Sequence, residues 1–343
     1  MRAFRIAGFT ALLIGAAAFL QANNAAPTLV VTSSNAANNQ LLVYDTSGKL
    51  VQSIATQGKG GAGGNAGGIA ARGDLLAVVN FGSNNVSLFS HAGNGFQFRH
   101  LVPAVPGPVS VAFGHGHMYI LGAMKIESHQ VFGSNVNTNP DGTAALVKAD
   151  GSSAQVGVLP NELIVTEKSN LIETVALRSD GSVAGSPAVT VQNIPSNVNA
   201  PFGLVTRGND AYVTIAHADE ISLVRNGAVL TTTPSVTQHA PCWLGLEGPF
   251  LYSSNSPSMT ISRYAVYGRK IVQDAAVAAS LAGTPTDIDV RGGVLGVIDA
   301  TAASVTNLSV YAVDEDGNLK LTGSATIPSA ANGMVVLARG AED

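Results

Sequence analysis

A pair of short apolar strands, separated by a polar turn, recurs along nearly the whole chain. The first pair reads Leu29-Val30-Val31-Thr32 and then Leu41-Leu42-Val43-Tyr44. Counting each pair from its first apolar residue gives seven anchors: Leu29, Leu76, Met118, Leu163, Ala211, Leu251 and Leu295. Successive anchors lie 40 to 48 residues apart, which is the repeat length of a four-stranded propeller blade. The repeat therefore predicts an all-β, seven-bladed β-propeller.

An additional apolar strand precedes six of the seven anchors and is expected to be the innermost strand of its blade. These segments are 67–71, 109–113, 155–159, 202–205, 242–246 and 288–290. The first anchor lies too close to the start of the chain to have one, whereas an unassigned apolar strand, Gly333–Leu337, stands near the end. We expect it to pair with Leu29–Thr32 and close the ring, because closure removes the exposed edges of an open array. Asp-Gly and Asn-Gly pairs at 180–181, 226–227 and 316–317 supply the positive φ that tight hairpins require.

The N-terminus has the layout of a secretory signal peptide. Two arginines in Met1–Arg5 precede an uncharged run, Ile6–Leu20, and small residues follow. The run has about 15 residues, fewer than the roughly 20 that span a bilayer as a helix. We expect residues 1–26 to be a signal peptide cleaved after about 22–26, with an uncleaved anchor as the alternative. The prediction is a periplasmic or secreted protein with no stable membrane span after cleavage, in which residues 27–343 form a single propeller domain.

The composition limits the partners and the covalent links of this chain. The net charge is −4, so there is no basic surface that could neutralise several phosphates, and nucleic acid is excluded as an expected partner. Only one cysteine, Cys242, is present, which rules out an intramolecular disulfide. We interpret Cys242 as a buried apolar thiol and expect the mature protein to be a monomer stabilised by packing and ring closure.

Three stretches resemble motifs of the lactonase-family propellers. They are Leu163–Lys168, the pair Cys242-Trp243 followed by Leu251–Asn255, and Ala330–Gly333. The family is named for Tyr-Val-Thr-Asn-like repeats and includes 6-phosphogluconolactonase and 3-carboxymuconate cyclase-like proteins; the resemblance extends from about Leu29 to Leu337. It implies a lactone hydrolase or cycloisomerase that acts on a small-molecule carboxylate or lactone. The inner strand of the third blade, within Gly107–Phe113, has no histidine, unlike that of the characterised enzymes, so the chain is more similar to the exported branch of the family.

Polar residues at equivalent positions of the blades are the candidate site. The residue four positions after each anchor ends its strand at one face of the propeller, and these residues are Ser33, Asn80, Gly122, Glu167, Ile215, Asn255 and Asp299. We expect them to ring the mouth of the central channel, where propellers bind ligands. In the enzyme hypothesis, Glu167 is a general base and His239 or His129 is its partner. Asn80, His217, Asn255 and Asp299 are candidate ligand-binding residues, and His217 shares one turn with Asp219 and Glu220.

Two alternatives use the same ring of residues. Asn80, Glu167, Asn255 and Asp299 could hold a calcium ion, because hard cations take several oxygen ligands; no other cofactor is expected. Alternatively the propeller binds a ligand or a partner protein without catalysis. Asn80 and Asn255 also stand where a strand enters a turn, and asparagine bonds its own backbone well there.

Two segments outside the repeat are expected to be loops. The glycine-rich run Gly58–Gly68 has no phosphate-binding lysine at the required place and is expected to be a flexible linker between blades. The segment Lys125–Ala144 is irregular, and its polar stretch, Gly133–Gly142, is expected to be an extended loop of the third blade, either a lid or a surface insertion.

Overall fold

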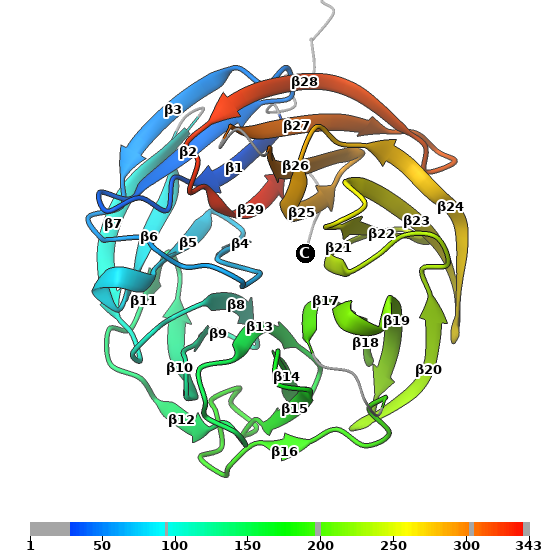
Figure 1. Cartoon of the computed structure of the whole chain (residues 1–343). Helices are drawn as coiled ribbons and strands as arrows, with labels where there is room; N and C mark the ends of the chain where they lie inside the picture. The colour runs from blue at the N-terminus through cyan, green and yellow to red at the C-terminus, as the bar shows by residue number, and fades with distance from the viewer. Residues whose placement is uncertain (1–27, 93–94, 196–199, 302–304, 339–343) are drawn as a thin grey trace, which may run out of the picture.

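Seven antiparallel sheets stand in a ring around a central axis (Figure 1). The computed structural model describes residues 28–92, 95–195, 200–301 and 305–338, and no α-helix occurs in these ranges. The predicted seven-bladed β-propeller is confirmed. The predicted signal peptide, residues 1–26, lies outside the described residues. In the part of the chain that is described, no helix has the length and apolar character needed to cross a bilayer.

Each blade has an inner, a second, a third and an outer strand. The inner strands are β4 (Ile69–Arg72), β8 (Ser110–Gly114), β13 (Ser153–Val158), β17 (Pro201–Arg207), β21 (Pro241–Glu247), β25 (Thr284–Arg291) and β29 (Asn332–Leu337). The second strands are β5 (Leu75–Asn80), β9 (His117–Leu121), β14 (Glu162–Glu167), β18 (Asp210–Ile215), β22 (Phe250–Asn255), β26 (Val294–Ala300) and β1 (Leu29–Ser33). All six inner strands expected from the sequence are present, each with boundaries shifted by a few residues.

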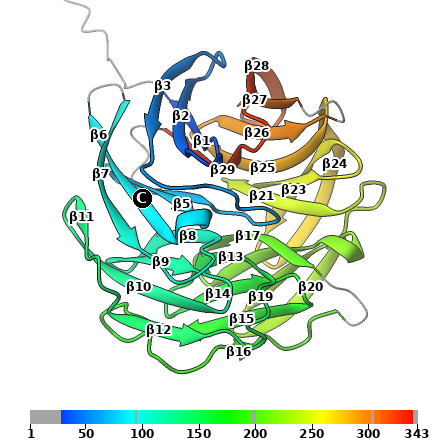
Figure 2. The same cartoon turned by 60° about the vertical axis from the view of Figure 1, so that its left-hand side comes forward.

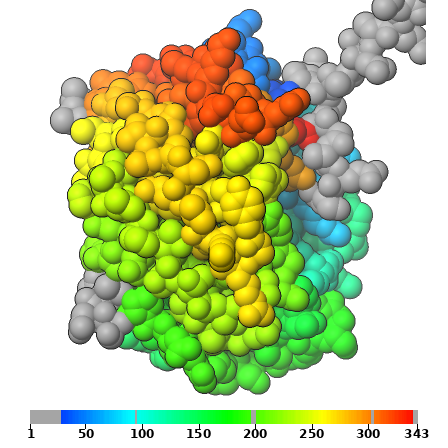
Figure 3. Space-filling view, turned by 90° about the vertical axis from the view of Figure 1, so that its right-hand side faces the viewer, coloured from blue at the N-terminus to red at the C-terminus, as the bar shows by residue number. Residues whose placement is uncertain are grey.

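The third strands are β6 (Asn85–Ala92), β10 (Lys125–Phe132), β15 (Leu171–Ala176), β19 (Glu220–Arg225), β23 (Thr260–Tyr267), β27 (Thr306–Val313) and β2 (Gln40–Asp45). The outer strands are β7 (Gly95–Pro103), β11 (Asn135–Val136), β12 (Gly142–Ala145), β16 (Val189–Thr190), β20 (Ala228–Pro234), β24 (Lys270–Ser280), β28 (Leu319–Ile327) and β3 (Leu50–Ala55). Two short 3-10 turns, Phe81–Ser83 and Ala216–Ala218, follow second strands. Figure 3 shows β24 and β28 forming part of the outer wall.

The apolar core lies between neighbouring blades, which explains why the second strands are apolar on both faces. Trp243 and Tyr252 of one blade pack with Ile288 and Leu295 of the next. Because each sheet is covered on both sides, the second strands are almost fully buried. Burying one such side chain contributes about 1.5–3 kcal/mol, and repetition around the ring stabilises the closed array.

The C-terminal strand closes the ring as predicted. β29 pairs antiparallel with β1, with Leu29 opposite Leu337 and Val31 opposite Val335. Thr32 adds a side-chain hydrogen bond from Oγ1 to the Gly333 carbonyl at 2.8 Å. The first blade therefore contains both ends of the described chain, in the order β29-β1-β2-β3.

The expectation of an extended loop within Lys125–Ala144 is correct only in part. Residues 125–132 form β10, which pairs with β9 and then with β12 and β11 on its other side. Glu127, Ser128 and His129 of β10 are buried. They are tolerated there because each finds a polar partner, as described below. In the polar stretch Gly133–Gly142, residues 133–134 and 137–141 connect strands without forming one.

Residues 56–68, here called the connector, join β3 to β4 and reach the centre of the ring before returning (Figures 1 and 2). The connector is ordered by contacts with distant blades and is not a free linker. The Asn65 side chain donates to the Val109 carbonyl at 2.6 Å, and Trp243 Nε1 donates to the Asn65 carbonyl at 3.1 Å. Ala66 N–H donates to Ala154 at 3.1 Å. The connector thus crosses the axis and covers one end of the channel. We call this end of the propeller the connector face and the opposite end, where inner strands turn into second strands, the hairpin face.

Candidate functional site

The predicted ring of polar residues is present as equivalent strand ends, but its side chains are enclosed in their own blades. Asn80, Asn255 and Asp299 each lie at or next to the end of a second strand, as does Glu167. All four side chains are fully buried. None of the four belongs to the lining of the axial cavity described below.

The two asparagines hold turns together. Asn80 Oδ1 accepts hydrogen bonds from Asn39 at 2.9 Å and Thr56 at 2.8 Å, and its amide donates to Asn85 and Ser87. Asn255 Nδ2 donates to Thr260 Oγ1 at 3.1 Å and to Ser262 Oγ at 2.8 Å. These contacts join the amide groups to side chains of adjoining turns and strands, whereas the alternative stated from the sequence was a hydrogen bond to the residue's own backbone.

The two carboxylates are buried with few partners. Asp299 Oδ2 accepts a hydrogen bond from Asn307 at 3.2 Å, whereas its Oδ1 has no partner in the described chain, and burial raises its pKa. Neither oxygen of Glu167 accepts a hydrogen bond from a described donor. Burial raises the pKa of Glu167 to about 8, and the neighbouring Glu173 carboxyl adds to the increase. Glu173 is itself held by the Val147 N–H at 3.1 Å. Glu167 is therefore predominantly protonated at pH 7.

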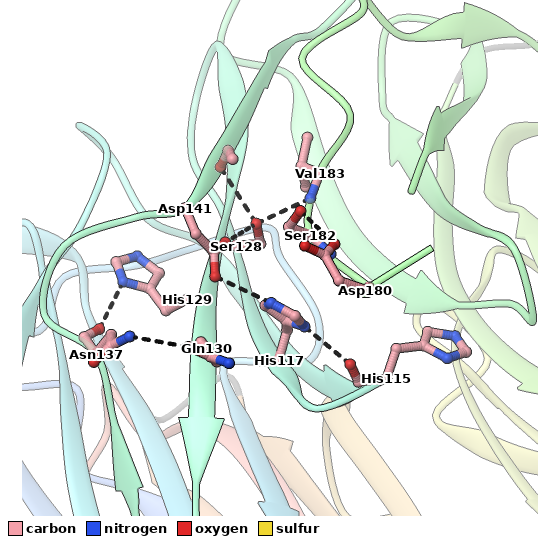
Figure 4. Close-up of polar contacts among 12 residues, drawn as sticks. His115, His117, Ser128, His129, Gln130, Asn137, Asp141, Asp180, Ser182 and Val183 are labelled. Atoms are coloured by element: carbon pink, nitrogen blue, oxygen red, sulfur yellow. Dashed lines mark hydrogen bonds and ion pairs between the residues drawn. The ribbon is translucent and has the colours of Figure 1, made fainter. Parts of the chain in front are cut away.

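The structure pairs His129 with Glu127 and does not bring it to Glu167. His129 Nε2 lies 3.3 Å from Glu127 Oε1, and Nδ1 lies 2.9 Å from the Asn137 carbonyl (Figure 4). Glu127 also accepts the Val105 N–H at 2.9 Å. His129 is completely buried. These contacts fasten residues 137–141 to the third blade.

A second histidine cluster lies beside His129. His117 Nε2 is 3.0 Å from Asp141 Oδ2, and Ser128 Oγ donates to Asp141 Oδ1 at 2.6 Å (Figure 4). In this order the carboxylate stands between the hydroxyl and the imidazole. The imidazole therefore cannot accept the hydroxyl proton, which a serine nucleophile requires. The cluster connects β9, β10 and the segment before β12.

His239 has the geometry of an oriented base, with Asp219 as its partner. His239 Nδ1 lies 2.8 Å from Asp219 Oδ2. Because an ionised carboxylate only accepts, this contact places the ring proton on Nδ1 and leaves Nε2 able to accept a proton. The side chains are 64% and 42% exposed, respectively, so the imidazole is open to solvent.

Backbone contacts fix the orientation of Asp219. Its Oδ1 accepts the Ala240 N–H at 2.7 Å, and its backbone carbonyl accepts from Ser235 N–H at 2.8 Å. Asp219 has φ 56°, a left-handed conformation at the end of the 3-10 turn that contains His217. The turn that the sequence singled out for His217 thus presents its acid to His239. His239 N–H donates to Ser258 Oγ at 2.8 Å, which fixes the backbone beside the imidazole.

Cys242 stands near this pair but is not activated. Burial raises the pKa of its thiol, and its Sγ accepts a hydrogen bond from Ser256 Oγ at 3.3 Å. A thiol that stays protonated is a poor nucleophile. The interpretation of Cys242 as a buried thiol holds only in part, because the residue is partly exposed, but its protonated state agrees with an inert role.

A cavity lined by the inner strands of all seven blades runs along the propeller axis and has a volume of about 460 Å³. Its polar lining includes Gln155, Arg207, Asp287 and Asp289, none of which the sequence analysis selected. The sequence does contain a pattern that could have identified the two aspartates. Within Thr284–Val290, acids alternate with apolar residues, which places Asp287 and Asp289 on one face of an inner strand.

No group of three or more histidine, cysteine, aspartate or glutamate side chains gathers as a metal site among the described residues. Asn80, Glu167, Asn255 and Asp299 belong to four different blades. Calcium binding stays a prediction.

Comparisons with known proteins support the fold. No protein-family profile matches the chain, and no curated protein sequence is significantly similar to it. Solved structures do match. The periplasmic gluconolactonase PpgL of Pseudomonas aeruginosa has 16% identity and a TM-score of 0.66, over 91% of this chain and 99% of that one. A provisionally assigned 6-phosphogluconolactonase from Bacteroides uniformis has 14% identity and a TM-score of 0.66, over 91% of this chain and 100% of that one.

A further match is the virginiamycin B lyase of Staphylococcus aureus, a catalytically inactive variant with quinupristin. It has 15% identity and a TM-score of 0.55, over 80% of this chain and 92% of that one. At these identities the similarity establishes a shared β-propeller fold and leaves the chemistry of this chain to its own residues.

Proposed function

We propose that this protein is an exported enzyme that hydrolyses a lactone, or forms one in the reverse reaction, with His239 as general base and Asp219 as the residue that orients it. The observation that carries the proposal is the 2.8 Å contact between His239 Nδ1 and an Asp219 carboxylate that is itself fixed by the Ala240 N–H. An imidazole held in this way presents Nε2 to solvent in the tautomer that accepts a proton.

The reaction follows from this arrangement. His239 Nε2 accepts a proton from water as the water oxygen attacks the lactone carbonyl. Asp219 stabilises the imidazolium that forms. When the ring C–O bond breaks, the imidazolium returns the proton to the leaving alkoxide, and the product is a hydroxy acid. The reverse sequence closes the ring with loss of water.

The substrate class and the location rest on two further observations. The solved structures of similar fold include a periplasmic gluconolactonase, which supports a lactone or related small carboxylate as substrate. The same name and the arginine-plus-apolar N-terminus support export to the periplasm or beyond the cell. Asp219 and His239 both lie on the connector face, since one follows a second strand and the other precedes an inner strand.

The test is hydrolysis of a lactone panel, measured by proton release with purified residues 27–343 at constant pH. We expect turnover above the spontaneous rate, and a fall in kcat of about 100- to 10,000-fold for His239→Gln. Asp219→Asn should lower kcat, because it removes the carboxylate that holds the ring proton on Nδ1 and stabilises the imidazolium. His100→Gln is the control, since the His100 ring is hydrogen-bonded to the Val136 carbonyl of the next blade, far from Asp219 in the ring order.

The same assay tests the candidates from the sequence. Glu167→Gln and His129→Gln should retain turnover if His239 is the base, and loss of turnover in a folded Glu167→Gln protein would restore Glu167 to that role. Addition and chelation of calcium test the predicted ion. Full activity of a folded His239→Gln variant refutes the assignment of His239. A folded wild type with no turnover on any lactone supports the alternative, a ligand-binding propeller without catalysis.

A further inference from the structure

The axial cavity is a separate compartment with its own chemistry. Every blade contributes to its wall through the inner strand, including Ile69, Val111, Leu204 and Val335. Its volume of about 460 Å³ lies within the range of small-molecule sites. Most of the residues that line the cavity are apolar types, and its charged side chains are Arg207, Asp287 and Asp289.

The connector covers one end of this cavity. Asn65 and Ala66 are almost fully buried, and Ala66 and Gly67 are part of the cavity lining. They are tied to three different blades through Val109, Ala154 and Trp243, as described above. A ligand therefore enters from the hairpin face while the connector keeps these contacts.

Two carboxyl groups face the cavity from β25. Asp287 and Asp289 are two residues apart and so share one face of the strand. Asp289 Oδ2 accepts the Val336 N–H at 2.7 Å, and Asp287 Oδ1 accepts the Ile288 N–H at 2.9 Å. Asp287 Oδ2 has no hydrogen-bond partner among the described residues, although Asp287 is only 4% exposed.

The surroundings of these acids carry little positive charge. Burial raises the pKa of Asp289 to about 6 and that of Asp287 well above its ordinary value. Arg291 opposes the increase at Asp289, whereas Glu247 adds to it. The pair is therefore short of cationic partners, and a buried carboxyl group in that state gains most from a cationic ligand.

One arginine marks the open end. Arg207 lines the cavity where β17 turns into β18, with Arg207 opposite Asp210 at the hairpin. In β25, the last residue before the hairpin is Arg291, which is opposite Val294. Asp289 lies two residues before Arg291 along the strand. At 3.3 Å per residue, the acids begin about 7 Å deeper than the guanidinium. Arg207 donates to the Gly248 carbonyl and lies 5.9 Å from the Tyr212 ring centre, which leaves further N–H donors for a ligand.

We propose that the axial cavity binds a small zwitterion, with its ammonium group at Asp287 and Asp289 and its carboxylate at Arg207. The acids deep in the cavity and the arginine at the hairpin face match the two ends of such a molecule. The apolar strands between them match a short methylene chain. This site is distinct from the His239–Asp219 pair, and its existence does not depend on the proposed lactonase reaction.

The chain contains its own probe, because Trp243 is the only tryptophan and lines the cavity. We would titrate purified protein with 4-aminobutanoate and 6-aminohexanoate and follow tryptophan fluorescence and heat. The single-group controls are butylamine and butanoate. We expect saturable binding of at least one zwitterion in the millimolar range or tighter, at least tenfold tighter than either control. At pH 6, close to the pKa of Asp289, binding should also release protons, because the ammonium group favours the ionised form of that carboxyl.

Matched variants separate binding from folding. Asp289→Asn and Arg207→Met should each weaken binding at least tenfold while the circular dichroism spectrum stays native. Arg72→Met is the control, because Arg72 ends the inner strand of another blade and is absent from the cavity lining. His239→Gln should bind like wild type, which distinguishes this site from the proposed reaction. The proposal is overturned if no zwitterion binds in the millimolar range, if butylamine binds as tightly as the zwitterions, or if Arg207→Met binds like Arg72→Met.

Discussion

Replacing Glu167 with glutamine should stabilise the protein at alkaline pH. Glu167 is fully buried, finds no hydrogen-bond donor and has the Glu173 carboxyl beside it. Its pKa rises from 4.5 to about 8, whereas in the unfolded chain it returns to its ordinary value. Since the folded state holds the proton more tightly, the stability is complete below about pH 4.5 and falls as the pH rises toward 8.

The magnitude follows from the size of the increase. An increase from 4.5 to about 8 corresponds to about 5 kcal/mol at 1.36 kcal/mol per pH unit. The Glu167 and Glu173 carboxyl groups repel each other and can share one proton. We therefore expect a smaller loss of the free energy of unfolding, about 3 kcal/mol, between pH 5 and pH 9. Glutamine has the shape of the protonated acid and carries no charge. Glu167→Gln should therefore match wild type at pH 5 and exceed it at pH 9.

The assay is urea unfolding of both proteins at pH 5, 7 and 9, followed by circular dichroism. Glu315→Gln is the control, because Glu315 is exposed. The free energy of unfolding of the Glu315→Gln variant should change with pH as it does in the wild type. An equal pH dependence in wild type and Glu167→Gln would refute the reasoning, as would a Glu167→Gln protein that is less stable than wild type at pH 9.

Two further changes test the turns and the ring closure. Asn80→Ala should lower the free energy of unfolding by about 2–4 kcal/mol, because it removes the buried hydrogen bonds of Asn80 with Asn39, Thr56 and Ser87; urea unfolding measures this, and a loss below about 0.5 kcal/mol would contradict it. Ending the chain after Ala331 removes β29 and exposes an edge of β1. We expect non-cooperative melting and aggregation by light scattering, whereas a cooperative transition within about 5 °C of wild type would show that closure contributes little.

The fold could be predicted because each blade has the same short strand pattern, which is repeated along the chain. Each anchor marks a second strand, and Gly333–Leu337 could be assigned to the first blade because no other strand lacked a partner. The predictions were wrong where a segment that resembles a loop or a linker in the sequence is ordered by contacts with distant residues. The segment Lys125–Ala144 looks irregular in the sequence, yet its first eight residues form β10, in which Glu127 and His129 contact backbone groups of Val105 and Asn137. The connector reads as a linker, yet Asn65 is fixed by Val109 and Trp243.

The candidate site was predictable only in part, for a related reason. His239 could be selected as a residue before an inner strand, but its partner is Asp219, 20 residues earlier, and only the packing of two neighbouring blades reveals the contact. The ring of strand-end residues was placed correctly along the chain. Its side-chain directions were not predictable, because a sequence does not show whether a polar residue such as Asn80 turns toward the axis or into its own blade.

The pairing of β29 with β1 also determines when the ring can close during synthesis of the chain. Leu29 and its partner Leu337 are 308 residues apart, so a ribosome must make almost the whole chain before the first blade can be completed. Until then, β1 and the neighbouring inner strands have an open flank that other nascent chains can join. Long-range pairing of this kind also slows folding, since the loop must close before the contact stabilises it. The pairing of β29 with β1 therefore ends the interval in which the incomplete ring is exposed to aggregation.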